Sequence, residues 1–195
     1  MGPALGPVYA VLSYDVTLAF ASRAVYKQLF GLPRRVEILY DVAGSFLGIL
    51  RNALLLDIVL QLARLVDRPQ TGGRPNLTLQ SLPPLVSGSA LRLEVEGLVQ
   101  SACDACDSAV DWRNRRLAHR DRLFALATTD ELLPSVTLAD IDKALQTFAV
   151  LLNCLQAHFE NEATTAYDWV QMGSADGLFH FLEKGLDAER RDSEP

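Results

Sequence analysis

The chain has 195 residues, of which 49% are hydrophobic, and its formal net charge is −6. This composition excludes an intrinsically disordered chain and is sufficient for one folded domain with a sizeable core. The negative charge argues against a protein that coats nucleic acid unselectively, because such binding comes mostly from neutralised phosphates. An odd number of cysteines, three, and an N-terminus without the features of a signal peptide favour a reducing cytosol, so we expect a cytoplasmic protein.

Helical periodicity dominates the chain, and no segment shows the alternation that is typical of a β-strand. A first helix is predicted over about residues 9–30. Gly31-Leu32-Pro33 should end it, because glycine suits a helix C-terminus and proline cannot continue a helix. The first long element therefore has a clear end in the sequence.

The second predicted helix, over about residues 34–66, is apolar almost all the way round. A helix with so little polar surface must be covered on several sides, by a bundle core or by a second subunit. Five charged residues interrupt its apolar stretch from Val36 to Val66, which argues against a membrane span and against a membrane partner. Its candidate buried residues are Val42, Phe46, Leu47, Leu50, Leu54, Ile58, Leu62 and Leu65.

Three further helices complete the prediction. A third is expected over about residues 89–127, and a fourth follows Pro134, where Thr137 and Asp140 have the spacing of a capping box. The inner faces of these two helices are predicted to consist of Val99, Ala102, Cys106, Ala109 or Val110, Leu117 and Phe124, and of Ile141, Leu145, Phe148, Leu152, Leu155 and Phe159. A last short helix should begin near Ser174 and bury Leu178, Phe179 and Leu182.

The predicted architecture is thus all-α, a helical bundle of about five helices. Residues 1–187 are expected to form a single domain. Residues 188–195 form a charged tail that we expect to be frayed.

The densest basic cluster lies on the third predicted helix, at residues 111–122, where five arginines and two aspartates give a formal charge of +3 around His119. Arginine forks match phosphate oxygens, and histidine can move protons near neutral pH. The cluster therefore has the side chains that phosphodiester binding or cleavage requires. A solvated helix face with charge pairs, such as Asp111 with Arg115, is the alternative interpretation.

Arg113 and Asn114 fall on the apolar face of that helix, between Val110 and Leu117. A desolvated guanidinium is costly unless it is paired. Either these side chains satisfy a structural network, or the apolar face opens here onto a cleft or a dimer partner. The candidate partners of Arg113 in a structural network are Glu94, Asp107 and Asp57.

On an ideal helix, Arg113 and His119 lie about 120° apart, so one straight helix does not favour their acting together. A distorted helix would bring them closer. So would two copies of the helix that meet across a twofold axis.

Arg113, Asn114 and His119, with five residues between the arginine and the histidine, resemble the motif of the HEPN superfamily, a helical domain shared by many prokaryotic RNases and toxins. Phe30-Gly31, the helix end at residues 63–67 and Asn76-Leu77-Thr78-Leu79 are similar to the AbiU-type abortive-infection branch of that superfamily. The late helices look similar too, so that the resemblance covers most of the chain.

The resemblance implies a dimeric bundle in which the motifs of both subunits line one cleft, and it implies metal-independent endoribonuclease chemistry. His119 would exchange protons with the attacking 2′-hydroxyl or the leaving oxygen, Arg113 would stabilise charge on the phosphoryl oxygens, and Asn114 would orient the groups. The expected products carry a 2′,3′-cyclic phosphate and a 5′-hydroxyl. The predicted RNA-binding residues are Arg115, Arg116, Arg120 and Arg122.

Asp121 stands where some toxin members have a tyrosine that a partner nucleotidyltransferase modifies, so this sequence gives no support to that route of regulation or to an antitoxin partner. Many members of the superfamily keep the fold without demonstrated catalysis. A catalytically silent module that binds RNA or nucleotide, or that serves as a dimerisation scaffold, is therefore the alternative.

The cysteines suggest a third, weaker hypothesis, a zinc or redox protein. Cys103 and Cys106 form a C-x-x-C pair, and Cys154 with His158 supplies two further donors that zinc accepts. Cysteine on one side of a helix is commonly a small core residue, however, and the two pairs would come from different helices. We therefore expect neither a metal nor another cofactor.

Overall fold

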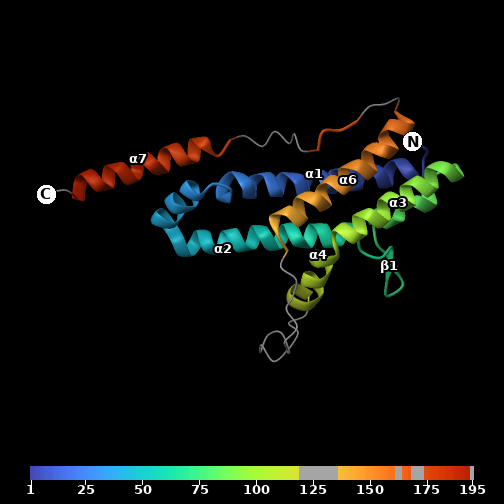
Figure 1. Ribbon diagram of the computed structural model, residues 1–195, viewed down its shortest axis with the longest axis horizontal. Helices are drawn as coiled ribbons and strands as arrows, with labels where there is room; N and C mark the ends of the chain where they lie inside the picture. The colour runs from blue at the N-terminus through green and yellow to red at the C-terminus, as the bar shows by residue number, and fades with distance from the viewer. Residues whose placement is uncertain (119–135, 161–163, 168–173, 194–195) are drawn as a thin grey trace. The chain divides into compact units, whose positions relative to one another are not determined.

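A computed structural model describes residues 1–118, 136–160, 164–167 and 174–193 (Figure 1). These residues confirm the all-α prediction. The long helices are α1 (Leu5–Phe30), α2 (Pro33–Leu65), α3 (Ser89–Ala105), α6 (Leu138–Phe159) and α7 (Asp176–Ser193), with the short helix α4 (Asp107–Trp112) after α3. Between α2 and α3 lie the two-residue strands β1 (Gln70–Thr71) and β2 (Arg74–Pro75) and the 3₁₀ turns η1 (Leu79–Ser81) and η2 (Pro83–Leu85), and the π-helical turn η3 (Arg113–Ala118) follows α4.

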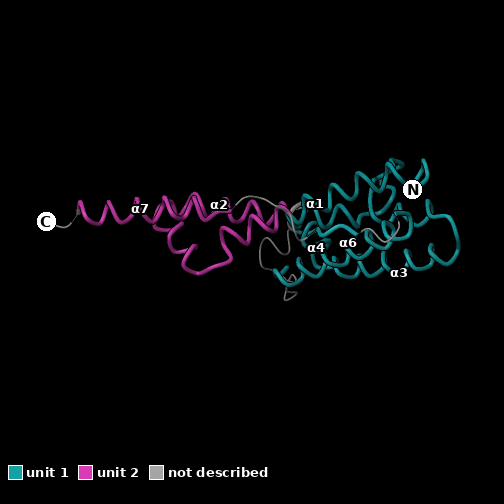
Figure 2. The backbone as a smooth tube through the Cα atoms, turned by 90° about the horizontal axis from the view of Figure 1, so that it is seen from above, with its two compact units in different colours: residues 1–20, 58–169 teal, residues 21–57, 170–195 magenta. Residues whose placement is uncertain are grey.

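The chain folds into two compact units (Figure 2). Unit 1 consists of residues 1–20 and 58–169, and unit 2 of residues 21–57 and 170–195. Both α1 and α2 contribute residues to both units.

The core of unit 1 lies where α3 packs against α6. The predicted inner faces are confirmed for Val99, Ala102, Cys106 and Ala109, and for Ile141, Leu145, Phe148, Leu152 and Leu155. Leu12 and Val16 of α1 and Ile58 and Leu62 of α2 are also fully covered. Phe159 is only half-buried, and Phe124 and the side chain of Leu117 lie outside the described residues.

The capping box at the start of α6 is confirmed. The Thr137 hydroxyl accepts a hydrogen bond from the Asp140 backbone N–H at 3.1 Å, and Asp140 Oδ2 accepts from the Thr137 N–H at 2.9 Å. These bonds favour the ionised carboxylate, so that the pKa of Asp140 lies below its usual range.

The prediction for the second helix is partly wrong, because the helix is interrupted at Ala43 (φ −159°, ψ 55°). Ile58, Leu62 and Leu65 are buried as predicted, and Leu47, Leu50 and Leu54 are half-buried. Next to the interruption, Val42 and Phe46 are 45% and 66% exposed.

By length and composition alone α1 and α2 could each cross a membrane, as core helices of soluble proteins also could. The absence of a membrane partner therefore stays a prediction.

The third predicted helix is not continuous. Cys106 leaves helical geometry (φ −105°, ψ 3°), and its N–H bonds to the Cys103 carbonyl at 2.9 Å, which tightens the last turn of α3. The backbone then continues as α4 and as η3.

The last helix, α7, begins at Asp176 and continues to Ser193, further than predicted. Phe179 is buried as expected, with the guanidinium of Arg35 4.6 Å above its ring centroid. Leu182 is half-buried, and Leu178, which was predicted to be buried, is 47% exposed.

We predict that Gly31→Ala destabilises the protein. The Gly31 N–H donates to the Lys27 carbonyl at 2.9 Å, and a Cβ at Gly31 would overlap that same oxygen. The free energy of unfolding, measured by urea denaturation, should fall by more than about 1 kcal/mol. Gly97→Ala on α3 is the matched control, because a Cβ there has no neighbour within 4 Å and alanine favours a helix. Equal stability of Gly31→Ala and wild type would contradict this account of the turn.

Candidate functional site

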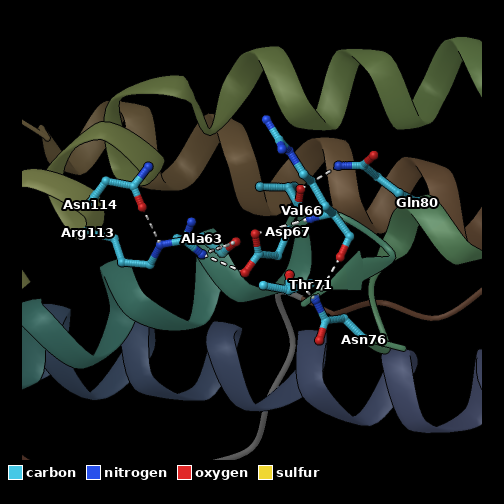
Figure 3. A network of polar contacts seen from close by, with 9 residues as sticks. Ala63, Val66, Asp67, Thr71, Asn76, Gln80, Arg113 and Asn114 are labelled. Atoms are coloured by element: carbon cyan, nitrogen blue, oxygen red, sulfur yellow. Dashed lines mark hydrogen bonds and ion pairs between the residues drawn. The ribbon is translucent and has the colours of Figure 1, made fainter. Parts of the chain in front are cut away.

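Arg113, the first residue of η3, has its side chain held on three sides (Figure 3). Nη1 donates to Asp67 Oδ2 at 2.8 Å and to the Ala63 carbonyl oxygen at 3.5 Å. Nε donates to Asn114 Oδ1 at 3.1 Å. With a side chain only 15% exposed, the guanidinium is largely withdrawn from water and needs this compensation. None of these bonds uses Nη2.

Asp67 is oriented by the chain that follows α2. Its backbone N–H donates to the Arg64 carbonyl at 3.3 Å, as the last helical turn closes. Its Oδ1 accepts the Arg68 backbone N–H at 3.1 Å, while Oδ2 accepts from Arg113. Each carboxylate oxygen therefore has its own donor, which fixes the plane of the carboxylate that Arg113 contacts.

Asn76 and Gln80 hold the loop that contains Asp67 (Figure 3). Asn76 Nδ2 donates to the Arg68 carbonyl at 2.9 Å and to Thr71 Oγ1 at 2.8 Å. Gln80 Nε2 donates to the Val66 carbonyl at 2.6 Å. The loop is thus tied to the end of α2 by side chains from beyond the hairpin.

The hairpin itself depends on two glycines. Gly72 and Gly73 connect β1 to β2 with φ of 57° and 80°. A two-residue connection with positive φ at both positions is the turn that fits the twist of a tight hairpin, and glycine adopts it without strain. This turn brings the chain back so that Asn76 can reach Arg68 and Thr71.

The predicted partners of Arg113 were wrong. Arg113 pairs with Asp67 rather than with Glu94, Asp107 or Asp57. Helical periodicity could not indicate Asp67, because this residue lies past the end of α2 in a loop and 46 positions away along the chain. The only signal in the sequence is that Asp67 and Asn76 both belong to the segments that carried the resemblance.

The structure describes only some of the remaining predicted site residues. Asn114 is exposed and bonded to Arg113, and Arg115 forms the predicted surface pair with Asp111, at 3.9 Å. The backbone of Arg116 belongs to η3. His119, Arg120 and Arg122 lie outside the described residues.

The π-helical turn changes the backbone on which the motif lies. Such turns are rare and usually occur as single turns within α-helices, frequently at functional sites. The regular α-helix ends at Trp112, and the π-helical turn follows it. The angle of about 120° between Arg113 and His119 was calculated for a regular helix and so does not apply to this backbone. Helix distortion was one of the two conditions under which these residues were expected to act together.

The three cysteines are free, and none is a ready nucleophile. Burial raises the pKa of Cys106 to about 12 and also raises the pKa values of Cys103 and Cys154, so the thiol form prevails at neutral pH. Among the residues that the structure describes, no group of three or more His, Cys, Asp or Glu side chains could hold a metal ion. The zinc or redox hypothesis gains no support from this arrangement.

The chain matches the model of the HEPN AbiU2 family over residues 17–178, and it belongs to this family. The matched region includes Arg113, Asp67, Asn76 and Gln80, so the whole network lies within the domain that defines the family. The protein is thus an abortive-infection-related HEPN domain. No curated protein and no solved structure matches the chain.

We predict that Asp67→Asn is more destabilising than Asp111→Asn. The first change removes the charge that balances a largely covered guanidinium, and it should lower the free energy of unfolding by about 1–2 kcal/mol. The second removes only the long surface pair with Arg115 and should cost less than about 0.5 kcal/mol. Chemical denaturation of both variants checks this, and equal losses would show that Asp67 is no more than a surface partner.

Proposed function

We propose that this protein is a toxin-like, metal-independent endoribonuclease of a prokaryotic abortive-infection system and uses Arg113, Asn114 and His119. The observation that carries the proposal is the fixed guanidinium of Arg113, which Asp67 and Asn114 orient at the start of a π-helical turn. Membership of the HEPN AbiU2 family supports the same assignment.

In the proposed reaction, proton transfer and charge stabilisation come from side chains. His119 exchanges protons with the attacking 2′-hydroxyl or the leaving 5′-oxygen, which contributes roughly 10²–10⁴-fold to the rate. Arg113 stabilises the charge that builds on the phosphoryl oxygens, since a preorganised donor acts without reorganising. Attack by the 2′-oxygen breaks the bond to the 5′-oxygen and leaves a 2′,3′-cyclic phosphate and a 5′-hydroxyl.

The arginines near the motif are assigned to the RNA backbone in this proposal. They are Arg115, Arg116, Arg120 and Arg122, and guanidinium groups form strong charge-assisted hydrogen bonds to phosphate. We place the protein in the cytoplasm, where its RNA substrates would be found.

We also propose that the protein is a homodimer. On α2 the large apolar side chains of Tyr40, Val42, Phe46 and Ile49 are 45–72% exposed. Burial of such apolar side chains against a partner is favourable, and a homodimer would cover them.

The alternative function is a silent HEPN module that binds RNA or nucleotide, or that serves as a scaffold. The ion pair between Arg113 and Asp67 favours it, because a covered arginine with a carboxylate partner already has a structural role. Cleavage that depends on His119 separates the two functions.

We predict that wild-type protein cleaves RNA in the presence of EDTA and that His119→Ala does not. Labelled total RNA is incubated with each protein, and the ends of the fragments are tested for cyclic phosphate. His180→Ala is the matched control, because His180 is exposed on α7 and has no assigned role. It should cleave as wild type does. Equal cleavage by His119→Ala would show that His119 is not the proton-transfer residue.

A further inference from the structure

A second basic segment lies far from residues 111–122 in the sequence. Between Asp57 and Glu94 the chain has four arginines and a single carboxylate, Asp67, whereas the whole protein has a net charge of −6. This segment spans the end of α2, the β1–β2 hairpin and the start of α3.

Three of these arginines, Arg64, Arg68 and Arg74, surround the hairpin, and we call them the hairpin arginines. Arg64 belongs to the last turn of α2, and its carbonyl accepts the Asp67 N–H. Arg68 follows Asp67 directly, and Arg74 pairs with Thr71 across the hairpin. The hydrogen bonds of Asn76 to Arg68 and Thr71 fix this part of the backbone.

The side chains of the hairpin arginines are exposed and form no hydrogen bond or ion pair with other described residues. The fourth arginine, Arg92, differs, because its Nε and Nη2 donate to the Val86 carbonyl at 3.3 and 2.9 Å. Arg92 therefore has a structural role, while the hairpin arginines are available to an external anion.

The ion pair of Arg113 with Asp67 connects the two basic segments. It places the first residue of the motif against the loop of the hairpin arginines, and it neutralises the one carboxylate of that segment. The positive charge of the hairpin arginines is therefore uncompensated within the segment and lies next to the proposed catalytic residue.

We propose that the hairpin arginines bind the phosphate backbone of an RNA strand whose scissile phosphate lies at Arg113. This inference rests on the proposed function and adds a substrate-binding surface to it. Guanidinium groups on a helix end, a loop and a strand suit an extended polyanion better than a compact anion. Contacts of this kind position the strand without reading its sequence.

The test measures RNA binding in a His119→Ala background, so that cleavage does not interfere. Fluorescence anisotropy with a labelled single-stranded RNA gives the affinity at several salt concentrations. The hairpin variant combines Arg64→Gln, Arg68→Gln and Arg74→Gln. The control combines Lys184→Gln, Arg190→Gln and Arg191→Gln, which makes the same change of charge on exposed positions of α7.

The hairpin variant should bind at least about tenfold more weakly, and its plot of log affinity against log salt should be shallower by about 2, since each lost phosphate contact contributes about 0.7. The control should keep the slope of its parent. Circular dichroism and thermal melting verify that both variants are folded.

Equal slopes for the hairpin variant and its parent would overturn this surface and leave the proposed cleavage intact. Equal losses in both triple variants would also overturn it, because they would indicate long-range charge and not contact. A parent that binds no RNA would overturn it as well, and the cleavage assay would then decide separately on the enzyme.

Discussion

The ion pair between Arg113 and Asp67 is the interaction on which the rest of the site depends. A guanidinium that is 15% exposed cannot be left without a partner, since the cost of burying an unpaired charge exceeds the contribution of most single contacts. The partner lies 46 residues away, past the end of α2. Its position requires a closed helix end, the β1–β2 hairpin with its two glycines, and the side chains of Asn76 and Gln80. The hydrogen bonds of this loop thereby fix the position of Asp67 and, through it, of Arg113.

The interruptions of the third predicted helix are the second constraint. A continuous α-helix would direct Arg113 and His119 to different sides, about 120° apart. The chain instead leaves helical geometry at Cys106, and at Arg113 it changes from α-helical to π-helical hydrogen bonding. Both irregularities lie within the region that matches the HEPN AbiU2 family. The second begins at Arg113, the first residue of the motif that the proposed chemistry uses.

What could be predicted from the sequence is what depends on local periodicity and capping. Gly31 ends α1, Thr137 and Asp140 begin α6, and the alternating three- and four-residue spacings give the inner faces of α3 and α6. What could not be predicted depends on long-range or backbone geometry. The Gly44-Ser45 pair beside Ala43 is of the kind at which helices kink, but the apolar pattern continues through it and favours one unbroken helix. The interruption leaves Val42 and Phe46 exposed. Asp67 was missed because a loop carboxylate has no helical register.

The central claim is that Asp67 and Arg113 stabilise each other directly, and a double-mutant cycle tests it most directly. The free energies of unfolding of wild type, Asp67→Asn, Arg113→Gln and the double variant give the coupling between the two side chains. The account predicts a coupling of about 1–2 kcal/mol, so that the double variant is more stable than the sum of the single losses would suggest. Strictly additive losses, with a coupling near zero, would contradict it and would separate the motif from the loop that is here assigned to hold it.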